Sequence, residues 1–167
     1  SGWVAVLGAA VVVGVGRVVN PAIVRGQCVG GMVQGRGTAL CEGYIYDQQG
    51  RLLNPSFTDN KIPTAKDIPD RIECMAVETA QLDGPFGARG VGEHPMISVA
   101  PAIGNAIQAA TGAELMHMPM RFADVWRARR YPEAVANWLP TSPPGACPPP
   151  RTDTRHRPAA RLPAPHA

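Results

Sequence analysis

The sequence predicts an α+β fold in which a mixed sheet packs against two main helices. Two segments have strand-like patterns: residues 3–15 are rich in valine, and residues 72–78 alternate loosely between apolar and polar side chains. Two other segments, residues 21–42 and 95–111, repeat small or apolar side chains every three to four positions, the spacing of one helix face. A chain of 167 residues has the length of one ordinary domain.

The first strand-like segment also resembles the apolar part of a targeting sequence. It has no basic residues in front of it, and it is shorter than the roughly 20 apolar residues that a membrane span needs. Valine-rich runs interrupted by glycine are typical of buried strands. We therefore expect one or two core strands here, and no membrane partner.

The first helix is predicted to begin at Asn20-Pro21, because Asn caps free amides and Pro favours the first helical position. The helix contains several glycines, each of which costs about 1 kcal/mol relative to alanine. Two interpretations stay open for them. They allow close packing against another element, or they allow a bulky cofactor to approach, with the amides of Gln27 and Gln34 free to bind polar ring edges.

The other segments are less regular. Residues 43–53 predict a strand, a turn and a short strand, and residues 54–69 predict an irregular connection. Residues 116–126 predict a strand followed by a short helix. We assign residues 1–138 to the folded domain and residues 139–167, which are rich in proline and arginine, to a disordered tail.

Charge and cysteine spacing exclude several functions. The net charge is +3, but much of the excess comes from arginines in the predicted tail, so we expect no nucleic-acid partner. No two of the four cysteines have the spacing of a zinc or iron-sulfur site. We expect reduced thiols, and therefore a cytoplasmic protein.

The stretch GPFGARGVGE at residues 84–93 concentrates constrained positions around one acid. Its four glycines allow positive φ angles and close backbone approach to a ligand, and Glu93 then precedes a predicted helix start. A glutamate at a helix start also complements the helix dipole, worth about 0.3 to 1 kcal/mol. The residues alone therefore leave a structural role and a catalytic role open.

This loop resembles the active-site loop of the molybdenum hydroxylases, the xanthine dehydrogenase and aldehyde oxidase family. Four further blocks resemble the same family in the same order: GRVVNP at residues 16–21, RGQCVGGMVQG at 25–35, NPSFTDNKIPT at 54–64 and APAIGNAI at 100–107. The resemblance covers about residues 16–125. It implies a partial molybdopterin-binding domain, the C-terminal part of the family's large subunit.

The resemblance implies roles for seven residues. Glu93 matches the family's catalytic base. The expected cofactor contacts are Gln34, Ala88, Arg89, Gly90, Val91 and Gly92. No metal ligand from the protein is expected, because in this family the pterin dithiolene holds the molybdenum. His94 is at most a neighbour that tunes Glu93.

The implied activity is oxidation of an aldehyde or N-heteroaromatic substrate, with water as the oxygen source. The cofactor is expected to be molybdenum-molybdopterin in its cytosine dinucleotide form, with iron-sulfur clusters and FAD only on partner domains or subunits. The implied partners are the N-terminal part of the large subunit, an iron-sulfur subunit and an FAD subunit. We expect this chain to be a fragment of such an oxidoreductase that is not active alone.

Two alternatives remain from the sequence. Gly14 stands where relatives usually carry an acidic residue, which favours a non-catalytic remnant or an accessory interaction protein that keeps the fold without a complete pocket. A nucleotide-binding module is the other, but residues 84–92 lack the glycine order of a dinucleotide fold and the Gly-Lys-Ser/Thr of a phosphate loop.

Overall fold

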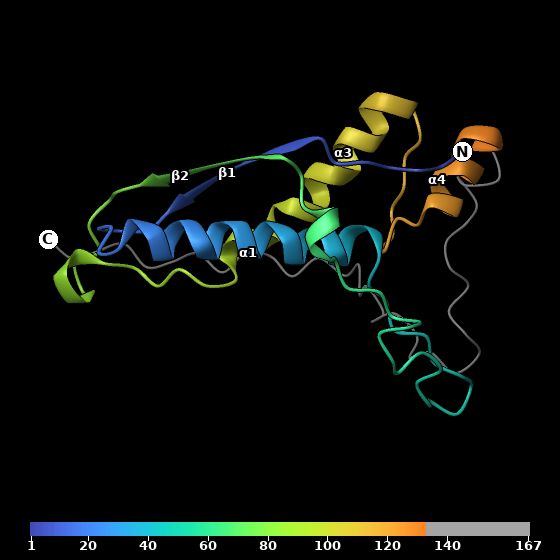
Figure 1. Ribbon diagram of the computed structural model, residues 1–167, viewed down its shortest axis with the longest axis horizontal. Helices are drawn as coiled ribbons and strands as arrows, with labels where there is room; N and C mark the ends of the chain where they lie inside the picture. Colours follow the sequence, from blue (N-terminus) through green and yellow to red (C-terminus); the bar gives the residue numbers. More distant parts are fainter. Residues whose placement is uncertain (133–167) are drawn as a thin grey trace, which may run out of the picture.

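A short parallel sheet covers one side of a long helix in the computed structural model, which describes residues 1–132 (Figure 1). Strand β1 (Gly8–Gly14) pairs with β2 (Arg71–Val77) in parallel. Helix α1 (Pro21–Leu40) lies along the sheet, and α3 (Val99–Thr111) packs against α1. The described chain is therefore an α+β domain, as predicted. The predicted tail lies outside the described residues.

A long connection that includes α1 separates the two strands in the chain, and parallel pairing requires a crossover of this kind. Val11 and Val13 point into the core, while Val12 between them is exposed. Within residues 1–132, antiparallel pairing is confined to two isolated bridges, Gly16 with Ala88 and Tyr46 with Leu52. The strand pair predicted for residues 43–53 therefore reduces to one bridge around a turn.

Helix α1 begins where its capping signal predicts. The Asn20 side chain accepts hydrogen bonds from the amides of Ala22 (3.1 Å) and Ile23 (3.2 Å). The helix ends at Leu40, two residues before the predicted boundary, and the Cys41 amide closes the last turn on the Gly37 carbonyl. No helix in the described part of the chain is long and apolar enough to span a membrane.

The second predicted helix is divided. Helix α2 (His94–Ile97) is followed by a single capping residue, Ser98, and α3 begins at Val99. Pro101 explains the break, because it has no N–H to donate to the carbonyl of Ile97, four residues earlier. The α3 helix then stops at Gly112, whose φ of +72° is left-handed.

Helix α4 (Phe122–Arg130) confirms the short helix predicted near the end of the described chain. The strand predicted just before it is wrong. In this segment the Met120 amide donates a hydrogen bond to the Ala39 carbonyl at the end of α1, at 2.7 Å, and the backbone pairs with no strand. One hydrogen bond and a proline at position 119 fix an irregular segment instead of a strand.

An ion pair between buried Arg36 and partly exposed Asp67 fastens the irregular connection to α1. Arg36 is 6% exposed, and its Nη2 lies 3.3 Å from Oδ1 of Asp67. Hydrogen bonds from Thr64 lower the pKa of the Asp67 carboxyl, and Arg36 lowers it further. The connection is therefore held against the C-terminal half of α1.

Candidate cofactor-binding site

The glycine loop is pinned to the chain that follows β1. The Arg17 amide donates to the Gly87 carbonyl at 2.8 Å, and the Arg89 amide donates to the Val15 carbonyl at 2.9 Å. Gly16, which lies between Val15 and Arg17, has a φ of +65°, and a Cβ on it would lie 2.5 Å from the Gly87 carbonyl oxygen. A side chain at position 16 would therefore separate the loop from the sheet.

Gln81 organises the inside of the loop. Its amide donates to the Gly87 carbonyl, and its own carbonyl accepts from the Gly84 amide. Its Oε1 accepts from Nε and Nη2 of Arg89, at 3.1 and 2.9 Å, and its Nε2 donates to Asp83. The loop is thus a closed hydrogen-bonded unit, and Arg89 uses two of its five donors within it.

Arg89 also lies over the end of β1. A Cβ on Gly14 would lie 3.4 Å from Nη1 of Arg89. An acidic side chain at position 14, the residue that the family resemblance leads one to expect there, would therefore face this guanidinium. Here Gln81 takes its place as the partner of Arg89.

After Arg89 the loop is open. The amides of Gly90, Val91 and Gly92 donate no hydrogen bond to any described residue. A Cβ built on Gly90 or Gly92 would meet nothing within 4 Å. Three successive free amides on an open backbone can bind oxo, carbonyl or phosphate oxygens.

Glu93 follows these amides and immediately precedes α2. It has helical φ and ψ angles, is exposed, and makes no hydrogen bond that caps α2. Because α2 has only four residues, its dipole offers Glu93 little stabilisation. His94 points inward: its Nε2 is buried and has no hydrogen-bond partner among the described residues. The geometry gives Glu93 no evident structural role in this chain.

Four of the five glycines of α1 divide into two sets. A Cβ on Gly31 would lie 2.9 Å from the Cβ of Pro95, and one on Gly35 would lie 2.6 Å from the Cβ of Val99. These glycines let α1 contact α2 and α3. A Cβ on Gly26 or Gly30 would meet nothing within 4 Å. Close packing therefore accounts for Gly31 and Gly35, whereas Gly26 and Gly30 leave space that a cofactor could approach.

The open glycines share a helix face with the two glutamines. At about 100° per residue, Gly26, Gly30, Gln34 and Gln27 fall within an arc of about 100°. We call this arc the open face of α1. It adjoins the Gly31 and Gly35 positions, against which the segment following Glu93 packs. Both glutamines are exposed.

The structure brings the elements together without closing a pocket around them. After the glycine loop, the chain runs back along α1 to α2 (Figure 1), so Glu93 and Gln34 come from elements in contact. Neither residue lines either of the two cavities described next.

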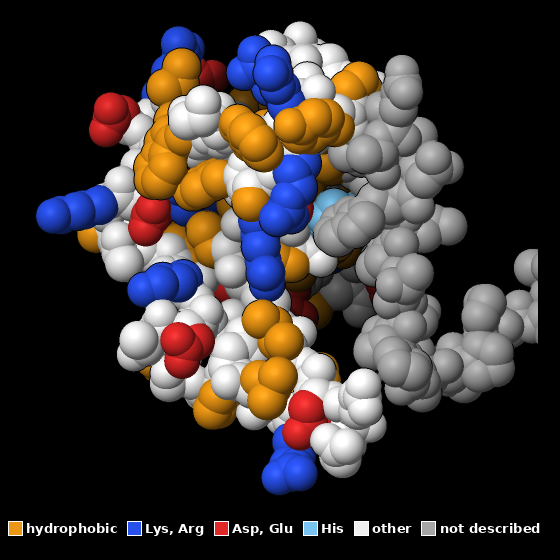
Figure 2. All heavy atoms as spheres, turned by 90° about the vertical axis from the view of Figure 1, so that its right-hand side faces the viewer, with side chains coloured by type: hydrophobic (Ala, Val, Ile, Leu, Met, Phe, Trp, Pro, Cys, Tyr) orange, Lys and Arg blue, Asp and Glu red, His pale blue; other side chains and the backbone are white. Residues whose placement is uncertain are grey.

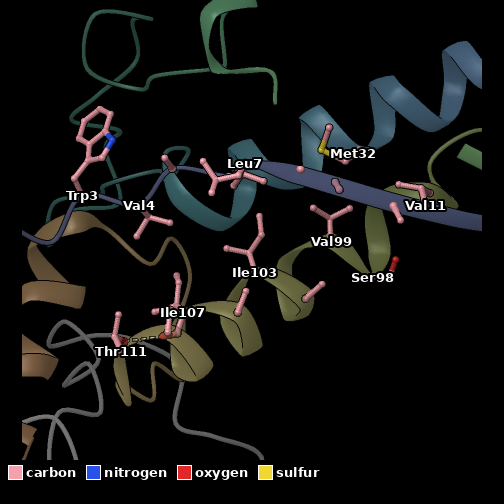
Figure 3. Close-up of a pocket in the computed structure, with 18 residues that line it drawn as sticks. Trp3, Val4, Leu7, Val11, Met32, Ser98, Val99, Ile103, Ile107 and Thr111 are labelled. Atoms are coloured by element: carbon pink, nitrogen blue, oxygen red, sulfur yellow. Dashed lines mark hydrogen bonds between the residues drawn. The ribbon is translucent and has the colours of Figure 1, made fainter. Parts of the chain in front are cut away.

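The first cavity is an apolar groove of about 600 Å³ between the N-terminal segment and α3. Figure 3 shows Trp3, Val4 and Leu7 on one side, and Ile103 and Ile107 on the other. Its lining carries no group suited to acid–base chemistry. The groove is therefore a packing surface and not a reaction site.

The second cavity, of about 710 Å³, lies between the end of α1 and α4. Asp124 is buried there and lies 3.5 Å from Nε2 of His117 and 3.3 Å from Nη1 of Arg127. Sequence reasoning missed this cluster, whose one local signal is the acid at the third position of α4. Within residues 1–132, no three His, Cys, Asp or Glu side chains gather to hold a metal ion.

Comparison with known proteins identifies the class. A family model described as "Molybdopterin cofactor-binding domain" matches residues 1–69, which include α1 and Gln34. The aldehyde oxidoreductase of Desulfovibrio desulfuricans has a similar solved structure, with a TM-score of 0.69 and 41% identity. That similarity covers 76% of this chain and 14% of the solved one. The fold is that of a molybdopterin-binding domain.

Two curated relatives extend the similarity in sequence. The aldehyde oxidoreductase of Megalodesulfovibrio gigas is 37% identical over 140 residues, 83% of this chain and 14% of the relative. The gamma subunit of the 6-hydroxypseudooxynicotine dehydrogenase complex of Paenarthrobacter nicotinovorans is 43% identical over 96 residues, 57% of this chain and 12% of the relative. The chain belongs to the molybdenum hydroxylase family and corresponds to the C-terminal part of its molybdopterin-binding large subunit. It spans about one seventh of its relatives' length.

Proposed function

We propose that this chain forms the C-terminal wall of the active site of a molybdenum-dependent hydroxylase. The enzyme would oxidise an aldehyde or an N-heteroaromatic substrate, with water as the oxygen source. One observation carries the proposal: the free amides that precede Glu93 lie on the loop that leads into α2, and α2 packs beside the open face of α1.

The residues present fit a pterin cofactor. The open face of α1 has room for a flat ring system, because side chains are missing at Gly26 and Gly30. The exposed amide of Gln34 can donate to and accept from pterin ring edges. The free amides of Gly90, Val91 and Gly92 can bind oxo or phosphate oxygens, and Ala88 and Arg89 hold this loop in place. We propose the cytosine dinucleotide form of the cofactor.

When bound, the cofactor supplies the two-electron redox centre for the hydroxylation. Glu93 is proposed as the general base, which accepts a proton at a carboxylate oxygen as a water-derived oxygen adds to the substrate. Such a base must be held within hydrogen-bond reach of the reacting oxygen, in a site from which bulk water is excluded. Glu93 is exposed in this chain, so the enclosure has to come from another part of the enzyme.

We propose that the N-terminal part of the same large subunit provides that enclosure. The sheet presents apolar side chains to solvent, with Val12 62% and Met75 63% exposed. The apolar groove beside α3 is a second uncovered surface. At the end of the molecule that carries α4, hydrophobic side chains also reach the surface between lysines and arginines (Figure 2). Surfaces of this kind mark contacts with other protein segments.

The electron-transfer partners are proposed from the relatives. The gamma subunit named above belongs to a dehydrogenase complex, and the nicotine 6-hydroxylase relative is named as a large subunit. We propose iron-sulfur and FAD groups on such partner subunits, and a cytoplasmic location consistent with the free thiols of Cys28, Cys41 and Cys74.

A non-catalytic remnant is the second candidate. It is favoured by the exposure of Glu93, and by Gly14, which leaves Arg89 without an acidic partner from β1. In that case the chain would keep the fold of the family but would neither bind the cofactor nor take part in catalysis.

A chimera distinguishes the two candidates. Residues 1–132 replace the aligned segment of the Megalodesulfovibrio gigas aldehyde oxidoreductase, and molybdenum content and aldehyde oxidation are measured. We expect molybdenum content close to that of the host enzyme and measurable oxidation. A chimera that folds like the host, by circular dichroism and thermal unfolding, but retains no molybdenum would contradict the proposed function and support the remnant.

A further inference from the structure

Two cysteines from different elements meet in the core. Cys28 of α1 is 1% exposed and belongs to the buried hydrophobic cluster between the helices and the sheet. Cys74 of β2 is half-buried and packs against the same cluster. In the sheet register Cys74 lies beside Val11, whose side chain also points into the core. Side-chain alternation in β2 therefore directs Cys74 toward the helix that carries Cys28.

The surroundings of the Cys28 thiol include Cys74. Burial raises the pKa of the Cys28 thiol, and the neighbouring Cys74 raises it further, by electrostatic interaction and by a hydrogen bond between the side chains. Cys41 also packs against the core cluster, but it lies at the end of α1, about 20 Å along the helix axis from Cys28, where Arg36, Asp67 and Glu42 are its charged neighbours. Among the cysteines of the described chain, Cys28 and Cys74 are thus the two whose elements, α1 and β2, pack on each other across the core.

We propose that Cys28 and Cys74 are an oxidisable pair that forms a disulfide between α1 and β2 when the protein meets hydrogen peroxide. Cys74 is the more accessible thiol, so it reacts first: peroxide transfers one oxygen to its sulfur, giving a sulfenic acid and one water. The Cys28 sulfur then attacks the Cys74 sulfur, and hydroxide leaves with the Cys28 proton as a second water. Two thiols lose two electrons in total, and peroxide is reduced to two waters.

The position of the bond connects it to the cofactor-binding elements. Helix α1 carries the open face with Gln34, and β2 leads into the glycine loop that precedes Glu93. A covalent link between α1 and β2 would fix the two elements relative to each other. The alternative is a structural role, in which both cysteines act only as small apolar side chains in the core.

Peptide mapping separates these possibilities in the full chain. Trypsin places each cysteine on its own peptide: Cys28 on residues 26–36, Cys41 on 37–51, Cys74 on 72–89 and Cys147 on 131–151. The purified protein is treated with hydrogen peroxide, its remaining thiols are alkylated, and the digest is analysed without reduction. We expect peptides 26–36 and 72–89 to appear joined, and to separate on reduction with dithiothreitol. Oxidation of urea-unfolded protein should give mixed pairings instead.

Variants give the second readout. Cys28→Ser and Cys74→Ser should each abolish the joined peptide, whereas Cys41→Ser should leave it unchanged. Oxidation should raise the apparent Tm of the wild type and of Cys41→Ser by about 5 °C, because the bond restricts the unfolded chain. If folded wild type instead joins Cys41 or Cys147 to another cysteine, or accumulates sulfinic acid at Cys74 with Cys28 still alkylated, the proposed pair is contradicted.

Discussion

Replacing Glu93 by Gln in the chimera is expected to lower kcat for aldehyde oxidation by about 10² to 10⁴, with molybdenum content unchanged. Gln has nearly the same size as Glu but cannot accept a proton at neutral pH. The Glu93 side chain makes no hydrogen bond with the described residues, and the Glu93 carbonyl, which accepts from the Met96 amide, is unchanged by the substitution, so the fold should not be disturbed. Its effect should be confined to proton transfer.

Glu114→Gln is the matched control, because Glu114 is also exposed and also makes no hydrogen bond with the described residues. Steady-state rates and metal content should be measured on the same preparations. The control should keep the rate of the unsubstituted chimera. A Glu93→Gln chimera that retains more than half of that rate would exclude Glu93 as the base.

Replacing Gly35 by Val is expected to destabilise the chain by about 1 to 3 kcal/mol. A Cβ at this position would lie 2.6 Å from the Cβ of Val99 and 3.0 Å from the Met96 carbonyl oxygen. A backbone atom cannot rotate away as a long side chain can, so α1 would have to move from α2 and α3. The urea midpoint at constant m-value measures the loss.

Gly30→Ala on the same helix is the control for that experiment. Its Cβ would meet nothing within 4 Å, and alanine favours helix, so this change should stabilise the isolated chain by about 0.5 to 1 kcal/mol. Equal destabilisation by both substitutions would show that Gly30 and Gly35 do not differ in how closely other elements pack against them.

Local signals predicted the main elements. Asn20 and Pro21 marked the start of α1, because capping depends on residues next to each other in the chain. The valine-rich run became β1, and Gly112 ended α3. The boundary at Ser98 was not predicted, although the effect of Pro101 on the carbonyl four residues earlier explains it.

The contacts between distant segments could not be predicted in this way. The backbone bonds that pin Gly87 and Arg89 to the residues after β1 have no side-chain signature. The same holds for the division of the α1 glycines, because a glycine that contacts Pro95 and one that faces open space look alike in sequence. Cys28 and Cys74 come to the same core only because a helix and a strand pack on each other.

Molybdenum content of the chimera carrying Gly30→Leu tests most directly whether the open face of α1 receives the cofactor. A Cβ at this exposed position meets nothing within 4 Å in the isolated chain, and leucine favours helix over glycine, so that chain should unfold at the same urea concentration as the wild type or a higher one. In the chimera we expect molybdenum to fall to a small fraction of the unsubstituted level, while Ala109→Leu, an exposed position on α3, keeps it. Full molybdenum content with leucine at position 30 would contradict the assignment of this face to the cofactor.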